Sequence, residues 1–552
     1  MTLSLLPSFS LSLSLSPASP SAFSAFAALY AALDATTSTA TKVTTLVAYF
    51  RAAAPADAAW ALALLTGRRP KRSVPTTRLR GWIGAAAGLP AWLVEESHTH
   101  IGDLAETAAL LTSRVNDDAA GLDESMTQVI EQRILTLAGQ TADQQQALVM
   151  ATWRLLPTAA CLVYTKLITG GFRVGVAAGL VQRAVAEAAQ VPVDVIANRL
   201  AGTWLPSAAA WIELTRKLAP ETVDPLDHEQ HQQGRPFPFA LAHAWDGHDL
   251  GDISGWQIEW KWDGIRAQLI HAADGTQRLW SRGDEELAAA FPEVLASAAL
   301  LPRGTILDGE VLAWADDHPL PFARLQKRLG RKKPTAAMLA ATPCRFLAYD
   351  CLALAGTDLR PQSTSARRTA LMQVPIERSP VLTPPDWPAA VALRAGAREH
   401  LVEGLMLKRC DAPYPRGRVT GAWWKWKSDP FTLDAVLLYA QAGHGRRAGL
   451  HTDYTLGIWQ GEQLVPVAKA YSGLTDAELT EIDRWVRAHT TETFGPVRKV
   501  EPLLVFELAF DGAQSSPRHK SGIALRFPRI ARWRRDKPAR EADTVESVRT
   551  LL

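Results

Sequence analysis

The sequence predicts a multidomain protein with an all-α N-terminal part, a central α+β part built on antiparallel sheets, and a small C-terminal β-barrel. The chain has 552 residues, which at about 150 residues per domain is enough for three or four domains. Residues 23–215 are rich in Ala and Leu and read as successive helices, whereas short alternating strands begin only after residue 237. A polar stretch with three prolines, residues 219–236, separates these two regions as a linker.

The composition is that of an ordinary globular protein. Hydrophobic residues make up 47% and charged residues 21% of the chain, which excludes a wholly disordered, collagen-like or coiled-coil protein. The net charge is only +3, but residues 526–540 hold six Arg and one Lys against a single Asp. Such a cluster predicts a surface that binds anions or nucleic acid.

The cysteines and the hydropathy pattern limit the cellular setting. Four cysteines are scattered along the chain without a C-x-x-C pair: Cys161, Cys344, Cys351 and Cys410. This spacing argues against a structural zinc site or a disulfide framework and favours a reducing, cytoplasmic compartment. The sequence contains no apolar run of about eighteen residues, so we predict no transmembrane helix and no membrane partner.

Residues 1–22 differ from the rest of the chain. They are rich in Ser, Leu and Pro and carry no charged side chain. A secretory signal peptide would need a basic n-region, which this segment lacks, and its three prolines oppose a regular strand. We predict a disordered leader, with a signal sequence as the alternative.

Residues 23–218 are predicted to form an all-α domain. In the stretch 180–189, apolar side chains recur at helical spacing at Val181, Ala184, Val185 and Ala188. Residues 237–430 are predicted to form the α+β domain. There, residues 258–282 read as two alternating strands around a turn at Asp274-Gly275, and further short strands are expected at 305–314, 345–354 and 403–409.

Residues 431–552 are predicted to form a small barrel of the OB type. A strand-like run opens the segment, and a hairpin over residues 454–471 should turn at Gly461. Thr475 and Glu478 form a capping box that should start one helix. About five strands with one helix suit this architecture.

The most promising reactive group is Lys261, which follows an apolar strand and precedes an Asp-Gly turn in the stretch 261–266. A lysine amine is a nucleophile once it has lost its proton. Arg266 follows closely and could bind a phosphate. The sequence has no G-x-x-x-x-G-K-[ST] loop, so any nucleotide site must use another device.

Six further segments complete a pattern behind this lysine: Ser281–Gly283, Asp308–Glu310, Phe346–Leu352, Glu403–Lys408, Trp423–Lys427 and Arg526–Arg529. In this order, and together with Lys261–Arg266, they resemble the motifs of the nucleotidyltransferase superfamily of ATP-dependent DNA ligases and RNA-capping enzymes. The resemblance implies an α+β nucleotidyltransferase (adenylation) domain followed by an OB-fold domain. It also implies that Lys261 attacks the α-phosphate of ATP and carries AMP as a phosphoramidate.

The resemblance assigns further residues to the nucleotide and to a metal ion. Glu259 would read the adenine amino group, and Phe346 would form an aromatic plate beside the base. The ribose and phosphates would be contacted by basic residues, namely Arg266, Arg282, Arg418, Lys425, Lys427, Arg526 and Arg529. Glu310 and Glu403 would supply carboxylates to Mg²⁺.

The N-terminal part separates DNA ligases from other members of the superfamily. Residues 102–111 and 166–175 resemble segments of the DNA-binding domain of multi-domain DNA ligases, which capping enzymes lack. Nicked double-stranded DNA is therefore the implied partner. NAD-dependent ligases usually add a four-Cys zinc module, which the cysteine pattern excludes, so ATP is the implied donor. Two departures are small: Tyr349 stands where Phe or another aromatic is common, and residues 170–172 replace a small-x-Leu pattern.

The implied protein is a monomeric ATP-dependent DNA ligase that seals nicks through lysyl-AMP and 5′-adenylated DNA, in repair, recombination or replication. Two alternatives remain open. An RNA-ligating or capping-type nucleotidyltransferase would prefer RNA or use GTP. A catalytically idle DNA-binding clamp would bind DNA but form no covalent adduct.

Overall fold

The structure is a computed structural model that describes residues 23–101, 103–112, 124–202, 204–217, 234–331, 333–415, 419–443, 450–471, 473–495 and 497–551. The predicted leader, most of the predicted linker and Arg418 lie outside the described residues.

The chain divides into two units. One consists of Val185–Leu205 and Ile212–Asp429, and the other of Met1–Ala184, Pro206–Trp211 and Pro430–Leu552. The division after Asp429 coincides with the predicted edge between the central domain and the barrel. Most helical residues after Ala184 group with the central sheets, although the sequence assigns them to the N-terminal domain. In line with this grouping, the backbone N–H of Gly202 donates to Asp284 Oδ1 at 3.4 Å.

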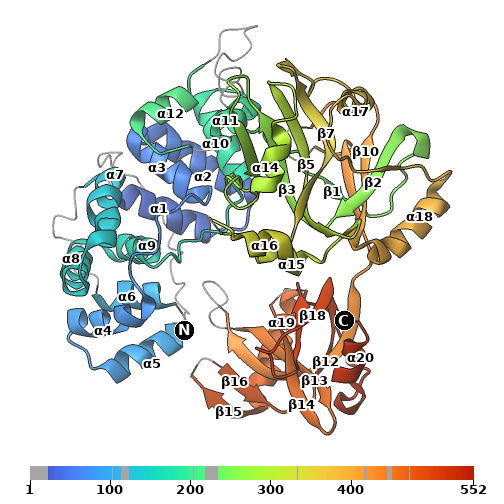
Figure 1. Cartoon of the computed structure of the whole chain (residues 1–552). Helices are drawn as coiled ribbons and strands as arrows, with labels where there is room; N and C mark the ends of the chain where they lie inside the picture. The colour runs from blue at the N-terminus through green and yellow to red at the C-terminus, as the bar shows by residue number, and fades with distance from the viewer. Residues whose placement is uncertain are drawn as a thin grey trace, which may run out of the picture. The chain divides into compact units, whose positions relative to one another are not determined.

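The N-terminal part is helical, as predicted, and is drawn in blue to teal in Figure 1. Side-chain caps set the start of several helices; for example, Thr141 and Gln144 form a capping box. Its helices are α1 (Phe23–Asp34), α2 (Thr39–Ala52), α3 (Pro55–Leu65), α4 (Thr76–Ala87), α5 (Ala91–Ile101), α6 (Leu104–Thr112), α7 (Met126–Gln128), α8 (Ala142–Leu155), α9 (Thr158–Ile168), α10 (Ala178–Ala189), α11 (Val193–Leu200) and α12 (Ala208–Leu214).

The glycine-containing loop after α9 is fixed to the helical core by one aromatic side chain. Phe172 is buried, with its ring 5.9 Å from that of Phe26 and 5.4 Å from that of Tyr30. The hydroxyl of Tyr30 donates to the carbonyl of Arg173 at 2.9 Å. This anchoring leaves Arg173 exposed at the surface of the helical part.

The central part contains two sheets that are antiparallel except for the short β1, which pairs parallel with β11. The first sheet has the order β4-β3-β5-β7-β8, with β6 on β5, and the second has the order β1-β11-β10-β2-β9. The strands are β1 (His243–Ala244), β2 (Trp256–Trp262), β3 (Ile265–His271), β4 (Gln277–Ser281), β5 (Thr305–Ala315), β6 (His318–Pro319), β7 (Cys344–Leu354), β8 (Thr357–Asp358), β9 (Val381–Leu382), β10 (Val402–Arg409) and β11 (Trp423–Lys427). The helices are α14 (Pro292–Ala298), α15 (Phe322–Gln326), α16 (Ala336–Ala341), α17 (Thr364–Met372) and α18 (Trp387–Ala395).

The stretch that the sequence reads as two strands forms three. The predicted turn at Asp274-Gly275 joins β3 and β4, and the Asp-Gly turn predicted after Lys261, at Asp263-Gly264, sends β2 and β3 into different sheets. At Gly264, an added Cβ would lie 2.5 Å from the carbonyl oxygen of Val311 and 2.7 Å from Cγ of Glu310. Only glycine permits this close approach, which leaves Lys261 near the end of β2 and Arg266 near the start of β3.

One face of the second sheet is rich in tryptophan, which accounts for much of the high tryptophan content. Ile258, Trp260 and Trp262 on β2 pack there with Leu405 and Leu407 on β10. Eight of the nineteen tryptophans of the chain belong to this cluster, namely Trp245, Trp256, Trp260, Trp262, Trp314, Trp387, Trp424 and Trp426. Because strand side chains alternate, the opposite face carries Gln257, Glu259 and Lys261.

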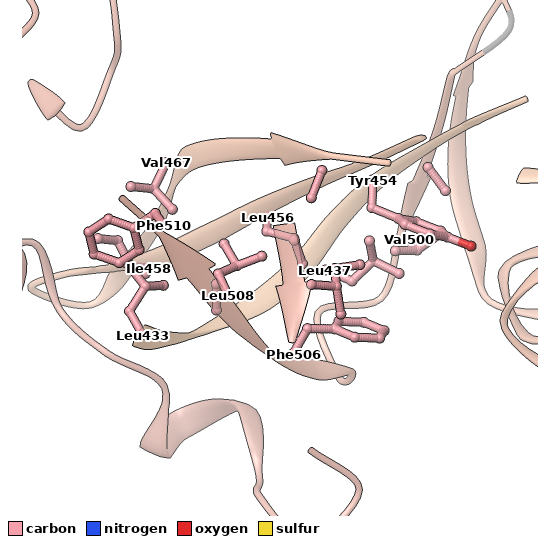
Figure 2. Close-up of a cluster of buried hydrophobic side chains, with 14 of the residues drawn as sticks. Leu433, Leu437, Tyr454, Leu456, Ile458, Val467, Val500, Phe506, Leu508 and Phe510 are labelled. Carbon is pink, nitrogen blue, oxygen red and sulfur yellow. The ribbon is translucent and has the colours of Figure 1, made fainter. Parts of the chain in front are cut away.

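The C-terminal part is an OB-fold-like sheet domain, as predicted. Its strands are β12 (Phe431–Ala442), β13 (His451–Gln460), β14 (Gln463–Ala470), β15 (Thr490–Phe494), β16 (Val497–Val500), β17 (Val505–Phe510), β18 (Gly512–Ser515), β19 (Ile523–Arg526) and β20 (Arg529–Trp533), with helices α19 (Asp476–Ala488) and α20 (Val545–Arg549). The predicted hairpin at Gly461 and the capping box of Thr475 and Glu478 are both present. Figure 2 shows the core, where Leu437, Leu456 and Phe506 are fully buried.

None of the described helices is long and apolar enough to cross a lipid bilayer.

Candidate active site

Lys261 lies within a compact group of charged side chains on the central sheets. Its Nζ is 2.6 Å from Oε2 of Glu403, and Nζ of Lys427 is 3.4 Å from the same oxygen. The three residues come from β2, β10 and β11, which are neighbours in the second sheet. Lys261 and Glu403 are about one-fifth exposed, at 22% and 20% of their side chains, so a substrate can reach both.

The backbone at Gly404 holds β10 close to β11 beside Glu403. Gly404 has φ +134, and an added Cβ would lie 2.2 Å from the carbonyl oxygen of Trp426. The backbone N–H of Ser428 donates to the carbonyl of Glu403 at 2.9 Å. The glycine after the glutamate is therefore required for the position of this carboxylate.

A second carboxylate, Glu310, faces the same group from the first sheet. Burial raises the pKa of Glu310 to about 8, and the carboxylates of Asp308 and Glu403 add to the rise, while Lys261 and Arg266 oppose it. In the register of β3 against β5, Glu310 lies directly opposite Arg266. The structure thus brings Lys261, Glu310, Glu403 and Lys427 into one electrostatic cluster.

Arg266 is already engaged by its surroundings. Its Nη2 is 2.6 Å and its Nε 3.1 Å from the carboxylate oxygens of Asp308, and its Nη1 donates to the carbonyl of Ala240 at 2.5 Å. The Tyr414 hydroxyl lies 3.3 Å from Nη2 and donates to Asp308 at 2.7 Å. Asp308 therefore balances the charge of Arg266. Through its bond to the carbonyl of Ala240, Arg266 also holds the segment before β1 against the first sheet. Its contact with ribose or phosphate stays a prediction.

Beyond Lys261 along β2, a buried polar cluster continues on the same face of the strand. Glu259 and Lys408 are each 1% exposed, with Nζ of Lys408 3.1 Å from Oε2 of Glu259. The side-chain amide of Gln257 donates to Oε1 of Glu259 at 2.5 Å. Burial raises the pKa of the Glu259 carboxyl, and Lys408 is the main group that opposes this rise.

Aromatic rings border this buried pair. Nζ of Lys408 lies 4.4 Å from the ring centroid of Tyr349 and 4.8 Å from that of Trp423. The same ammonium donates to the backbone carbonyl of Tyr349 at 3.3 Å. Tyr349 belongs to β7 of the first sheet, so the cluster is lined by both sheets.

The position of Phe346 contradicts the prediction that it forms the plate beside adenine. Phe346 is 3% exposed and packs in the core of the first sheet with Leu269 on β3, Val294 on α14 and Leu371 on α17. Its ring also fills the space over Gly309, where an added Cβ would lie 2.4 Å from Cζ of Phe346. The side chain therefore faces the helices, whereas Tyr349 contacts the polar cluster.

The remaining predicted nucleotide contacts of the central part occupy different positions. Lys425 lies between Trp424 and Trp426 on β11, opposite Met406 of β10, and is partly exposed. Arg282 is exposed just after β4, and its backbone N–H donates to the carbonyl of Arg266 at 3.1 Å. Arg418 lies outside the described residues, so its role stays a prediction.

Arg526 and Arg529 belong to the other unit. The guanidinium of Arg526 lies 5.3 Å from the ring centroid of Phe527, which is exposed and has φ +52. Nη1 of Arg529 is 3.0 Å from Asp511 Oδ1. Their roles toward a nucleotide stay predictions.

The basic run around these arginines is more neutral than its sequence implies. Besides the Arg529–Asp511 pair, it forms the ion pairs Arg532–Glu507, Arg534–Asp434, Arg534–Asp536, Arg535–Glu481, Lys537–Asp434 and Arg540–Glu541. The acidic partners come mainly from β12, β17 and α19. A phosphate would therefore have to displace carboxylates, most of them in exposed pairs of small net energy.

The carboxylates beside Lys261 fit a magnesium ion better than a protein-enclosed metal. Among the described residues, no group of three or more His, Cys, Asp or Glu side chains is arranged to hold a metal ion. Mg²⁺ is usually bound by one or two carboxylates together with substrate phosphates and water. Glu310 and Glu403 meet that requirement.

Comparisons with known proteins agree with this geometry. Three family descriptions match in order: "DNA ligase N terminus" over residues 22–186, "ATP dependent DNA ligase domain" over 252–427 and "ATP dependent DNA ligase C terminal region" over 447–537. A "Probable DNA ligase" of Koribacter versatilis is 31% identical over 543 residues, covering 92% of each chain. A "Probable DNA ligase" of Rhodococcus opacus is 37% identical over 411 residues, covering 70% of this chain and 76% of the relative.

A solved structure supports the fold. "Pmar-Lig_PreS3" matches with a TM-score of 0.55 at 16% sequence identity and covers 92% of this chain and 99% of that chain. The extent of the match to the Koribacter relative, together with the ordered family segments, leads to one conclusion. The chain belongs to the ATP-dependent DNA ligases.

Proposed function

We propose that Lys261 is the nucleophile that takes AMP from ATP in the first step of nick sealing. The observation that carries this proposal is the contact of its amine with Glu403, a carboxylate that Lys427 also contacts and that lies next to Glu310. In that step Nζ of Lys261 forms a bond to the α-phosphorus, and the bond from this phosphorus to the bridging oxygen of pyrophosphate breaks. The ammonium of Lys261 must first give up a proton, and Glu403 is an acceptor 2.6 Å away.

The surrounding charges suit a phosphoryl group that gains negative charge. Lys427, with Lys425 two residues before it on β11, offers cations to the phosphates. Glu310 and Glu403 would hold Mg²⁺, which when bound supplies charge neutralisation at the phosphates. The AMP then passes to the 5′-phosphate of a nick, and the 3′-hydroxyl displaces it to seal the strand.

The base is proposed to lie against the cluster of Glu259, Lys408 and Tyr349. Tyr349 replaces Phe346 as the aromatic partner of adenine, because Phe346 is enclosed in the core of the first sheet. Arg266, Arg282 and Arg418 are kept as proposed ribose or phosphate contacts.

The helical part is proposed to bind the duplex on either side of the nick. Its loop after α9 carries exposed Arg173, and the loop between α3 and α4 carries exposed Arg69, Lys71 and Arg72. The two loops touch, since the backbone N–H groups of Ser73 and Val74 both lie 3.1 Å from the carbonyl oxygen of Ile168. Contacts of these cations with phosphates would favour nick geometry over base sequence.

We also propose that the protein acts as a monomer in a reducing, cytoplasmic environment. All four cysteines are free thiols, and three of them are buried. Cys344 and Cys351 belong to the apolar core of the first sheet, where thiols behave as small hydrophobic groups.

Incubation with α-labelled ATP and Mg²⁺, followed by a denaturing gel and a nicked-duplex assay, tests the proposal. A labelled protein band that Lys261→Ala abolishes, together with sealed DNA, is the expected result. Labelling by GTP in preference to ATP, or sealing of RNA in preference to DNA, would favour the capping-type or RNA-ligating alternative. DNA binding without any adduct would favour the idle clamp.

A further inference from the structure

We propose that Arg394 is a positioning residue for the first step, because it fixes the end of β11 and so keeps Lys427 aimed at the phosphates of ATP. This inference rests on the proposed function, in which Lys427 offers a cation to those phosphates. Lys427 is the last residue of β11, and the other unit of the chain begins three residues later, at Pro430. A residue that must stay in place therefore lies next to the boundary between the two units.

The edge of β11 shows how the end of the strand is held. β1 runs beside this strand at Trp424 and Lys425, and the backbone N–H of Trp245, which follows β1, donates to the carbonyl of Lys425 at 3.1 Å. Carbonyls two residues apart on a strand point to the same side. The next carbonyl on this edge is that of Lys427, and it accepts from Nε of Arg394 at 2.6 Å. Arg394 thus supplies the donor that the backbone of a neighbouring strand would otherwise provide.

The other contacts of Arg394 add to this bond. Its guanidinium lies 5.3 Å from the ring centroid of Trp426, and its side chain is 17% exposed. Its Nη2 forms an ion pair with Asp429, whose side chain is 84% exposed. Arg398, four residues later, donates to the carbonyl of Asp429. Because an exposed ion pair contributes little, the bond to Lys427 and the packing on Trp426 should account for most of the hold on β11.

The helix that carries Arg394 is itself fixed to the second sheet. Trp387, the first residue of α18, donates its Nε1–H to the carbonyl of Gly251 at 2.8 Å. Ala390 of the same helix is fully buried in the tryptophan-rich cluster of the second sheet. Arg394 therefore joins the end of β11 to a helix that is anchored within the same unit.

This anchoring allows the position of Lys427 to be independent of the C-terminal unit. Nζ of Lys427 is 3.4 Å from Oε2 of Glu403, the carboxylate that Lys261 also contacts. A displacement of about 1 Å near a reacting group costs on the order of 100-fold in rate. With Arg394 in place, a movement of the unit that starts at Pro430 should not pass along β11 to this group of charges.

The test is a double-mutant cycle between positions 394 and 427, measured as kcat/KM for the formation of labelled adduct from α-labelled ATP and Mg²⁺. Arg394→Met keeps much of the side-chain volume but removes the donor, and it should lower this value about 10- to 100-fold. In a Lys427→Ala background the same change should lower the value by less than about threefold, because the residue that Arg394 positions is already gone. A merely structural role would give the same loss in both backgrounds.

Two further variants separate the contacts of Arg394. Arg345→Met is the matched control, because Arg345 also lies over a tryptophan, 5.7 Å from the ring centroid of Trp314, and forms an exposed ion pair in the same unit. It should keep the wild-type rate within about twofold. Asp429→Asn removes the ion pair but not the bond to the carbonyl of Lys427, and it should stay within about threefold of the wild type.

The failures can be told apart. If the wild type forms no adduct, or if Lys427→Ala keeps the full rate, the proposed function or its assignment of Lys427 is wrong. If both behave as proposed but Arg394→Met keeps the wild-type rate, or loses the same factor in both backgrounds, the positioning role is wrong.

Should Arg394→Met fail to fold, as judged by circular dichroism, the same cycle with Arg394→Lys decides the matter. This variant should lose at least about threefold in the presence of Lys427, since an ammonium does not reproduce the planar donor that lies over Trp426. No loss, or an equal loss in both backgrounds, contradicts the inference.

Discussion

The break between β2 and β3 at Gly264 should be essential for the position of Lys261. In Gly264→Ala the new methyl group would lie 2.5 Å from the Val311 carbonyl oxygen, 2.7 Å from Cγ of Glu310 and 2.7 Å from a methyl group of Leu312. All three atoms belong to β5, which is paired with β3 on one side and β7 on the other, and the nearest of them is a backbone oxygen. Relief of the clash therefore requires movement of the β2–β3 turn.

The magnitude follows from how far the turn has to move. Carbon and oxygen atoms in ordinary contact lie about 3.2 Å or more apart, so the shift is on the order of 0.7 Å. Overpacking of this kind costs about 1–3 kcal/mol of stability. A misplacement of about 1 Å near a reacting group costs on the order of 100-fold in rate. We expect a folded variant whose adenylation rate is reduced by roughly that factor.

The assay is the rate of labelled adduct formation at saturating ATP, with circular dichroism to verify the fold. Gly255→Ala is the matched control, because Gly255 immediately precedes β2 and an added Cβ there has no heavy atom within 4 Å. It should retain the wild-type rate within about twofold. Full activity in folded Gly264→Ala would refute the requirement for this close approach.

Three further predictions concern the base, the metal carboxylate and the basic run. Tyr349→Leu should raise KM for ATP with little loss of stability, whereas Phe346→Leu should mainly lower the unfolding free energy, by about 1 kcal/mol; the opposite pattern would restore Phe346 as the base contact. Because the pKa of Glu310 is raised to about 8 in the folded protein, the metal-free protein should lose stability as pH rises from about 4.5 to 8. Mg²⁺ binding, measured by calorimetry, should strengthen over the same pH range and level off above it. Glu310→Gln should remove both pH dependences. The Arg526→Ala/Arg529→Ala double variant should fail with ATP and a plain nick yet seal a pre-adenylated nick within about tenfold of the wild-type rate, and equal loss on both substrates would contradict a role confined to the first step.

The fold was largely predictable because its signals are local. Ala-rich periodic stretches, a turn glycine at 461 and the Thr475–Glu478 capping box each depend on residues a few positions apart. The Asp-Gly pair after Lys261 predicts a turn, but the sequence does not show that this turn sends β2 and β3 into different sheets. The cause of this separation is the approach of Val311 and Glu310, which lie more than forty residues away in the sequence.

The site was only partly predictable for a related reason. Lys261 and the two carboxylates proposed to hold Mg²⁺, Glu310 and Glu403, could be named from their motifs. Phe346 and Tyr349 are three positions apart on one strand, so they point to opposite faces, and the sequence does not reveal which face meets the base. Lys408 carries no sign in the sequence that it pairs with Glu259, since the contact depends on the register of β10 against β2.

The basic run shows the same limit for electrostatics. Its arginines and lysine suggest a strongly positive surface when read in order. The structure supplies neutralising carboxylates from distant positions, such as Asp434 on β12 and Glu481 on α19. Charge counted along a sequence therefore overstates the field that a ligand meets.

The most direct measurement of the central claim is the mass of the intact protein after incubation with ATP and Mg²⁺, for the wild type, Lys261→Ala and Lys261→Arg. The account predicts a mass increase of one AMP in the wild type and none in either variant, because alanine has no amine and arginine does not lose its proton to attack. Peptide mapping should place the AMP on Lys261. An AMP adduct in either folded variant would contradict the assignment of Lys261 as the nucleophile.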